Sequence, residues 1–360
     1  VWYENDGDVI NGAWTKRTIN SILRSYSTDA EVVNIDNDGD NDVIAIADYD
    51  VFWYENDGTP LDGGWIEHQI AAATFHDIEV YDIDGDGKKD LIGRNQGVSG
   101  NIIYLYQQNT PTSWNPAVQI AVQSGEGLLM RDVDVDGDYD IIASGEWYEN
   151  TNVVGSIGSW TPHTYYSGFT DFDLYIDMAD VNGDGREDII TSPSEGAGGI
   201  DNICWFEALL NRSTAWTPHI IDSGVETVHH FVGTGDFDLD EDVDVASSEM
   251  QQGTNPDEVK IYLNDGAGNS WTKFLLSSLG SHSNKVVDID NDGDLDLFGA
   301  NHDNPDQVKL WVNNVSTGTT PLSLDLWTYI QVDNNRVHDN PNYQKAFGLA
   351  MGDVNNDALG

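Results

Sequence analysis

Short apolar runs alternate along this chain with acidic, glycine-containing turns. The runs Val43–Ile46 and Ile141–Ala143 each follow directly on such a turn, and so do the pairs Leu91-Ile92 and Ile189-Ile190. Short runs rich in β-branched residues and bounded by Gly and Asp are typical of β-strands. Because no segment keeps a helical period over a useful length, the pattern predicts an all-β protein.

The acidic turns are copies of one nine-residue pattern. It occurs in full at Asn34–Asp42, Asp82–Asp90, Asp132–Asp140, Asp180–Asp188, Asp236–Asp244 and Asp288–Asp296, and a seventh copy begins at Asp353. Oxygen-bearing side chains stand at positions 1, 3, 5 and 9, and position 6 is Gly in five of the six complete copies. Hard cations such as Ca²⁺ take six to eight oxygen ligands, and glycine permits the tight turn that surrounds one ion. We therefore expect Ca²⁺ as the cofactor, at about six to seven structural sites.

The candidate calcium ligands are the side chains at positions 1, 3, 5 and 9. They are Asn34, Asp36, Asp38 and Asp42; Asp82, Asp84, Asp86 and Asp90; Asp132, Asp134, Asp136 and Asp140; Asp180, Asn182, Asp184 and Asp188; Asp236, Asp238, Asp240 and Asp244; Asp288, Asp290, Asp292 and Asp296; and, in the incomplete seventh copy, Asp353, Asn355 and Asp357.

These loops are not EF-hands. An EF-hand needs a bidentate Glu at position 12 and a helix on either side. Position 12 of the complete copies holds Ala45, Gly93, Ala143, Thr191, Ser247 and Gly299. Each loop is therefore expected to join two strands.

The spacing of the loops indicates the architecture. Successive copies start 48, 50, 48, 56, 52 and 65 residues apart, close to the period of four-stranded propeller blades. An aromatic strand and a strand that begins with Trp recur at the same spacing as the loops. The strands that begin with Trp start at Trp14, Trp65, Trp114, Trp160, Trp216, Trp271 and Trp327. Residues 1–360 are thus expected to form one domain, a seven-bladed β-propeller of four-stranded antiparallel blades with a calcium loop in each blade.

The two ends of the chain complement each other. Joining Phe347–Gly360 to Val1–Ile19 would nearly complete one blade, so we expect the N- and C-terminal strands to close the ring. The strand that should follow the last loop is missing, which predicts a fragment of a longer secreted protein.

These residues carry a family resemblance. The segment Phe347–Asp357, with Phe347-Gly348 followed by Gly352-Asp353, resembles the FG-GAP repeat, and the other units resemble its looser VCBS variant. The family implies a seven-bladed β-propeller like the integrin α-subunit head and certain fungal lectins. It also implies the four side chains as calcium ligands, with a fifth oxygen from the backbone carbonyl at position 7. Position 7 is occupied by Asp40, Lys88, Asp138, Arg186, Asp242 and Asp294.

Two copies depart from the pattern. Asn34 at position 1 of the first copy keeps an oxygen and loses a charge, and Glu241 stands where the fifth copy should have Gly. We therefore expect the fifth site to be strained, weaker or empty.

Charge excludes some partners. The formal net charge is −48, and 30 of the 63 acidic residues lie in the seven loops. Such a surface repels nucleic acid and anionic membrane, so neither nucleic-acid binding nor direct membrane insertion is expected. With a single cysteine, Cys204, the blades have no disulfide framework. Calcium loops of the extracellular class bind weakly, which predicts a secreted or cell-surface protein.

The candidate functional face is built from two sets of loops. One set leads into the first strand of each unit, and these are here called the leading loops; the other set joins the second strand to the third. Counting six residues back from each acidic loop gives Thr28, His76, Glu126, Leu174, His230, His282 and Phe347, which equivalent strands would place on one circle. His76, Glu126, His230 and His282 could hold a transition metal or supply acid–base groups to a lyase or dehydratase acting on sugars. Polar residues that only hydrate the channel mouth are the alternative.

Aromatic residues suggest a different use of the same face. The candidate ligand contacts are Tyr26, Phe75, Phe169, His338, Asn342 and Tyr343. His68, His163 and His219 each follow a strand-leading Trp by three residues, and we interpret them as stitching within blades. The sequence favours a calcium-stabilised extracellular recognition module that binds carbohydrate as a lectin does. An integrin-like adhesive module with an extracellular protein partner and a sugar-active enzyme are the alternatives, and the sequence favours a non-enzymatic role.

Overall fold

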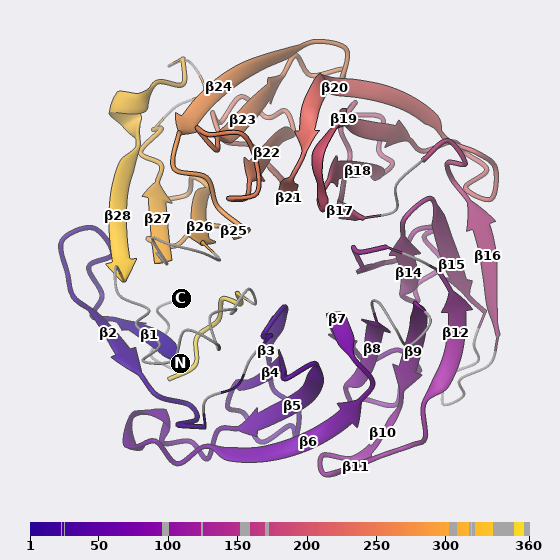
Figure 1. Ribbon diagram of the computed structural model, residues 1–360, viewed down its shortest axis with the longest axis vertical. Helices are drawn as coiled ribbons and strands as arrows, with labels where there is room; N and C mark the ends of the chain where they lie inside the picture. The colour runs from indigo at the N-terminus through magenta and orange to yellow at the C-terminus, as the bar shows by residue number, and fades with distance from the viewer. Residues whose placement is uncertain are drawn as a thin grey trace. The chain divides into compact units, whose positions relative to one another are not determined.

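The computed structural model shows an all-β protein, a β-propeller of four-stranded antiparallel blades (Figure 1). It describes residues 1–22, 24, 26–95, 101–123, 125–151, 159–169, 173–301, 308–316, 318, 321–333 and 349–355. Among these residues no helix is long and apolar enough to cross a membrane.

Six blades of four strands follow one another along the chain. The first blade has β3 (Ala30–Val33), β4 (Asp42–Ala47), β5 (Asp50–Glu55) and β6 (Ile66–Ala72), and the second has β7 (Phe75–Tyr81), β8 (Asp90–Asn95), β9 (Ile102–Tyr106) and β12 (Val118–Val122). The third has β13 (Leu129–Arg131), β14 (Asp140–Ala143), β15 (Glu146–Asn150) and β16 (Trp160–Thr164), and the fourth has β17 (Leu174–Ala179), β18 (Asp188–Pro193), β19 (Gly196–Glu207) and β20 (Thr217–Thr227). The fifth has β21 (His229–Gly235), β22 (Asp244–Glu249), β23 (Val259–Asn264) and β24 (Trp271–Ser277), and the sixth has β25 (Ser283–Val287), β26 (Asp296–Ala300), β27 (Val308–Val312) and β28 (Thr328–Asp333).

Two smaller sheets accompany the blades. They pair β1 (Trp2–Asn5) with β2 (Trp14–Arg17), and β10 (Gln108–Thr110) with β11 (Ser113–Trp114). The short 3₁₀ turns are η1 (Pro60–Asp62) and η2 (Leu324–Leu326).

The blade count differs from the seven predicted. The described residues form six four-stranded blades, and β1–β2 pair only with each other. Residues 334–348 and 356–360, which include most of the segment predicted to close the ring, lie outside the described residues. Residues 349–355 are described and form no strand.

The chain divides into two compact units. One comprises Val1–Ser124, Thr151–Ser159 and Val337–Gly360, and the other comprises Gly125–Asn150 and Trp160–Arg336. We call them unit 1, which holds the first and second blades, and unit 2, which holds the third to sixth. Within each unit the first strands of neighbouring blades touch, as β3 touches β7 and as β17 touches β21.

Burial changes from strand to strand across a blade. First strands alternate between buried and half-buried residues, as in β17. Ile176 and the other buried residues of β17 pack in the core shared with the third blade, while Tyr175 and Ala179 on the other face pack toward the fifth. Second strands are buried almost throughout, as in β18 and β22, since sheet neighbours flank them and other blades cover both faces. Fourth strands are largely exposed. The apolar runs after the acidic loops are therefore second strands.

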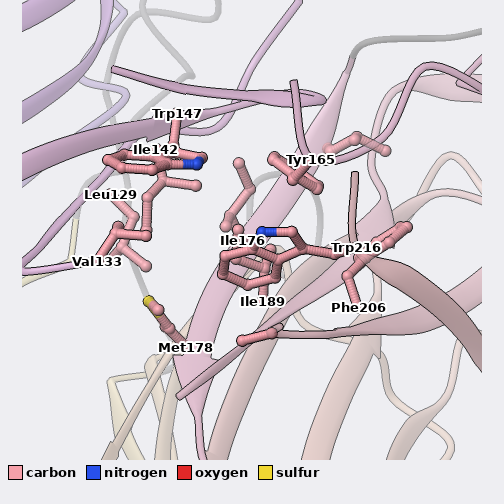
Figure 2. Close-up of a cluster of buried hydrophobic side chains, with 12 residues drawn as sticks. Leu129, Val133, Ile142, Trp147, Tyr165, Ile176, Met178, Ile189, Phe206 and Trp216 are labelled. Atoms are coloured by element: carbon pink, nitrogen blue, oxygen red, sulfur yellow. The ribbon is translucent and has the colours of Figure 1, made fainter. Parts of the chain in front are cut away.

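The hydrophobic cores lie between blades. Figure 2 shows one, in which Ile142 and Trp147 of the third blade meet Ile176 and Ile189 of the fourth. Trp147 has no exposed surface. Similar cores join the first blade to the second, the fourth to the fifth and the fifth to the sixth. Each blade's stability thus depends on its neighbour.

A repeated contact joins the third and fourth strands, as the sequence predicted for His68, His163 and His219. His68 stacks on Trp53 at 4.5 Å between ring centroids, and its Nε2 lies 2.7 Å from Oε2 of Glu55. The equivalent groups are His163 with Trp147 and Glu149, and His219 with Trp205 and Glu207. These histidines are structural.

The turn at position 6 of the acidic loops requires a left-handed backbone. Gly39, Gly87, Gly137, Gly185 and Gly293 have φ between +84° and +108°, and a Cβ added at any of them would meet nothing within 4 Å. Glu241 adopts φ +75° at the same position, and its N–H donates to Oδ2 of Asp236 at 3.0 Å. Left-handed backbone costs a non-glycine residue roughly 1–2 kcal/mol, so the fifth loop carries strain that the others avoid.

We expect Glu241→Gly to stabilise the protein by about 0.5–1 kcal/mol, because strain relief exceeds the entropy that glycine adds to the unfolded chain. The matched control is Gly185→Ala, which has room for its methyl group and should destabilise by about 1 kcal/mol through backbone strain alone. Denaturant unfolding in a common buffer measures both variants. Equal stability of Glu241→Gly and the parent would contradict the strain argument.

Candidate functional site

The position-9 aspartate of each acidic loop is a buried clamp. Its Oδ2 accepts a hydrogen bond from the backbone N–H at position 2 of the loop, at 2.8–3.3 Å in all six complete copies. Its Oδ1 accepts from a backbone N–H at the end of the third strand, at 2.7–2.9 Å. These six residues are Asp42, Asp90, Asp140, Asp188, Asp244 and Asp296, and each is at most 1 % exposed. One carboxylate therefore fixes both the loop and the adjacent strand.

Burial alters the acidity of these clamps. Desolvation raises the pKa to about 6 for Asp42, about 7 for Asp90 and Asp188, and about 8 for Asp140, Asp244 and Asp296. The backbone hydrogen bonds lower these pKa values, and neighbouring loop carboxylates raise them again. The acidic loops thus place carboxylates in buried positions, where desolvation makes the ionised form unfavourable.

Positions 1, 3 and 5 or 9 bring acidic oxygens together. The clusters whose ligand atoms lie within 4.8 Å of one another are Asp82, Asp84 and Asp86; Asp132, Asp134 and Asp136; Asp236, Asp238 and Asp244; and Asp288, Asp290 and Asp296. In the other two complete loops an amide, Asn34 or Asn182, takes one of these places.

The clusters fit a hard cation. Oδ1 of Asp134, of Asp238 and of Asp290 is buried, and within the described residues it has no hydrogen-bond partner. A buried carboxylate oxygen without a donor is costly, and a divalent ion is the partner that several such oxygens can share. The acidic clusters could therefore hold metal ions.

Position 7 distinguishes two loops from the rest. The Lys88 ammonium pairs with Asp86, and the Arg186 guanidinium pairs with Asp184, in each case at position 5 of the same loop. These cations compete with a metal for one carboxylate. Asp40, Asp138, Asp242 and Asp294 at the equivalent positions add negative charge instead.

The incomplete seventh loop packs on the first blade. The Asn41 side-chain amide donates to the backbone carbonyl of Asp353 at 2.8 Å, and that of Asn56 donates to the carbonyl of Val354 at 2.9 Å. Asn355 is described, whereas Asp357 lies outside the described residues.

The opposite end of the first blade carries a pair of stacked tyrosines. Tyr26 in the leading loop and Tyr49 in the β4–β5 turn lie 4.3 Å apart between ring centroids, at 23°. Arg24 pairs with Asp48 at 3.3 Å and with Glu67 at 2.6 Å. The acidic loop joins β3 to β4, so these residues lie at the other end of the strands.

The backbone at this place is strained. Tyr26, Asp48 and Tyr49 have φ values of +49°, +53° and +69°. Non-glycine residues seldom adopt this conformation, and those that do cluster at functional sites. Tyr49 remains 36 % exposed. This pair, with Arg24 and Asp48, is named the tyrosine platform.

The other predicted ligand contacts are either buried, partly buried or outside the described residues. Phe75 is 1 % exposed and is therefore a core residue, contrary to prediction, because Gly93 leaves room for its ring. Phe169 is partly buried against Tyr166 and Phe206. His338, Asn342 and Tyr343 lie outside the described residues.

Three members of the predicted His/Glu circle meet in unit 2. The rings of His230 and His282 lie 3.9 Å apart between centroids, and Nε2 of His230 lies 3.5 Å from Oε2 of Glu126. His76 belongs to unit 1, where its Nδ1 lies 3.1 Å from Oδ1 of Asp77. The sequence analysis missed Glu195, whose Oε1 lies 3.4 Å from Nε2 of His230. Glu195 lies in the β18–β19 turn, which joins a second strand to a third, whereas the predicted circle contained only residues of the leading loops.

Two neighbouring carboxylates, those of Glu126 and Glu195, favour the protonated form of His230. Burial opposes protonation of this ring, but Glu126 and Glu195 outweigh it and raise the pKa of His230 to about 9. Glu126 is itself 1 % exposed, and its Oε2 accepts a hydrogen bond from Ser194 Oγ at 3.1 Å. The cluster thus attracts a positive charge into a buried position.

Comparisons with known proteins agree with the fold. A search of curated proteins found no match to the sequence. A family model described as an FG-GAP-like repeat matches residues 34–93 and 236–298. A solved Agrocybe aegerita lectin, described as recognising non-reducing terminal N-acetylglucosamine, is similar at a TM-score of 0.60 and 17 % identity, covering 92 % of this chain and 88 % of its own.

Two further solved structures are more distant. AofleA from Arthrobotrys oligospora matches at a TM-score of 0.47 and 10 % identity, over 86 % of this chain and 87 % of its own. The biofilm matrix protein Bap1 of V. cholerae matches at 0.45 and 14 %, over 76 % of this chain and 44 % of its own. The chain is therefore a β-propeller that contains FG-GAP-like repeats.

Proposed function

We propose that this chain is an extracellular carbohydrate-binding β-propeller whose acidic loops hold structural calcium ions. The observation that carries the proposal is the tyrosine platform, a strained and partly exposed aromatic pair flanked by a guanidinium and carboxylates. The lectin-like fold of the Agrocybe aegerita neighbour agrees with it.

The platform has the chemistry that a sugar needs. A pyranose ring presents an apolar C–H face, which an exposed aromatic ring can cover, and hydroxyls, which charged and amide groups can bind. Tyr49 offers the ring, while Asp48 and Arg24 offer an acceptor and a donor beside it. The Arg24 guanidinium lies 4.0 Å from the Phe52 ring centroid, which together with its ion pairs holds it in place.

Calcium suits the acidic loops better than other ions do. Their donors are carboxylate and amide oxygens, which hard cations prefer. Loops of the extracellular class bind Ca²⁺ with dissociation constants of about 10⁻⁴–10⁻³ M, which only extracellular calcium would fill. The proposal of a secreted or cell-surface location rests on this affinity class.

Removing calcium should lower the melting temperature by more than about 10 °C, because several ions each add binding free energy to the folded state alone. Thermal unfolding in millimolar Ca²⁺ and in EGTA measures the difference. Adding excess Ca²⁺ back is the control and should restore the first curve. Identical melting curves in Ca²⁺ and in EGTA would contradict the proposal that the loops hold calcium.

In chelator, stability should fall as pH rises from about 5 to about 8. The position-9 carboxyls have folded pKa values of about 6 to 8, above the unfolded value of about 3.9, so the folded state binds more protons in this range. These carboxyls contribute fully to folding stability below their pKa in the unfolded state, and this contribution is lost as the pH rises through their pKa in the folded state. Melting temperatures at both pH values test the sign.

The same measurement in saturating Ca²⁺ is the control for pH. In saturating Ca²⁺ the loss of stability with rising pH should be smaller or should reverse, since calcium binds the ionised carboxylates and competes with protons. A chelated protein that melts higher at pH 8 than at pH 5 would contradict the assigned pKa directions.

A glycan array in millimolar Ca²⁺ should identify a defined set of bound sugars, and Tyr49→Ala should weaken their binding at least about tenfold, or about 1.4 kcal/mol. The expected loss reflects the missing ring face. Tyr329→Ala is the matched control, because Tyr329 is 42 % exposed on β28 of unit 2. It should bind as the parent does.

Calcium-dependent melting of each variant checks that it is folded. A folded parent that binds no glycan would refute the proposed function. Equal losses in Tyr49→Ala and Tyr329→Ala would refute the platform as the binding site.

A further inference from the structure

We propose that His230, His282 and Glu195 form a binding site for a divalent transition-metal ion such as Zn²⁺, separate from the acidic loops. One ligand atom from each residue lies within 4.8 Å of the others, close enough to share one ion. The proposal does not depend on sugar binding.

Three neighbouring blades of unit 2 supply the ligands. Glu195 lies in the β18–β19 turn of the fourth blade, His230 is the second residue of β21 in the fifth, and His282 directly precedes β25 of the sixth. The first strands β17, β21 and β25 touch in sequence, which brings these places together. All three lie at the end of their blades opposite the acidic loops.

His230 is a buried side chain whose ring nitrogens lack a hydrogen-bond partner among the described residues. It is 3 % exposed, and within the described residues neither of its ring nitrogens makes a hydrogen bond. Its Nε2 faces the carboxylates of Glu195 at 3.4 Å and Glu126 at 3.5 Å, without the alignment of a hydrogen bond. Burying an unsatisfied imidazole beside two carboxylates is unfavourable unless a cation joins them.

The donor set selects the class of ion. Two imidazoles and one carboxylate are typical ligands of Zn²⁺ and of other first-row transition metals, whereas Ca²⁺ prefers oxygen alone. Three protein ligands leave a coordination position for water or another small ligand.

Neighbouring residues hold these ligands in place. The hydroxyl of Ser283 lies 3.1 Å from Nδ1 of His282, and Ser194 donates to Glu126. Tyr175 packs against His230 at 4.9 Å between ring centroids. Hydrogen bonds and contacts of this kind orient metal ligands and tune their affinity. Glu126 is therefore a positioning residue that adds negative charge beside the ion.

A proton on His230, held between Glu126 and Glu195, is the competing occupant. The two occupants differ in a measurable way, since a cluster that holds only a proton binds no zinc. Saturating Ca²⁺ keeps the acidic loops from taking up the added metal.

Calorimetric titration of Zn²⁺ into the full chain in excess Ca²⁺ tests the proposal. We expect one Zn²⁺ per chain, a zinc-dependent rise in melting temperature, and visible d–d absorption when Co²⁺ replaces zinc. Glu195→Gln and His282→Ala should each weaken zinc binding by about 100-fold or more and abolish the Co²⁺ absorption. Glu195 is partly exposed, so its variant is the less disruptive of the two.

His163→Gln is the matched control, because His163 also pairs with a glutamate but stacks on Trp147 and not on a second imidazole. It should bind zinc like the parent. Melting curves in Ca²⁺ without zinc show whether each variant folds. Absence of stoichiometric zinc binding by the folded parent, or binding by folded Glu195→Gln that equals the parent's, would overturn the proposal.

Discussion

A buried carboxylate with two backbone partners organises each blade. The position-9 aspartate receives one N–H from its own loop and one from the end of the third strand, in all six blades. A charged-group hydrogen bond of this kind contributes about 1.5–3 kcal/mol, and losing the acceptor would strand two donors. The clamp fixes where the acidic loop begins and ends, and in four of the six complete loops it accompanies a close cluster of acidic oxygens.

The two ends of the blades carry different kinds of polar side chain. At the acidic loops, carboxylate and amide oxygens face one another, and in two loops Lys88 or Arg186 pairs with one of the carboxylates. At the other end, carboxylates are accompanied by histidine around His230 and by tyrosine and arginine around Tyr49. Hard cations suit the first environment, while mixed donors suit softer ions or hydroxyl-rich ligands. The same antiparallel strands thus separate acidic, oxygen-rich loops at one end of each blade from mixed donor sets at the other end.

Much of the fold could be predicted because it repeats. The acidic loops, the apolar second strands and the Trp-led fourth strands recur often enough for their spacing to identify blades. The roles of His68, His163 and His219 were predictable for the same reason, since each keeps one distance from a strand-leading Trp. The seventh blade was predicted on the same repetition, but the described residues contain only the isolated pair β1–β2 in its place.

The candidate sites were harder to predict because they depend on residues that do not repeat. Phe75 is buried because Gly93, on the paired strand, leaves space: a Cβ there would come within 2.4 Å of the Phe75 ring. Glu195 and Tyr49 lie in turns between strands, where no periodic pattern marks them. Side-chain convergence of this kind is a tertiary property, and a single sequence does not contain it.

The placement of the cores between blades also bears on how such a chain can change in evolution. The apolar face of a blade is buried by the neighbouring blade. Trp147 of the third blade is covered by the fourth, and Trp205 of the fourth packs with residues of the fifth. Deleting part of a blade would expose two neighbours, whereas duplicating a whole one reproduces the surface that it covers. Insertions are tolerated in the connections, which explains why the repeat length ranges from 48 to 65 residues while the nine-residue loop keeps its length.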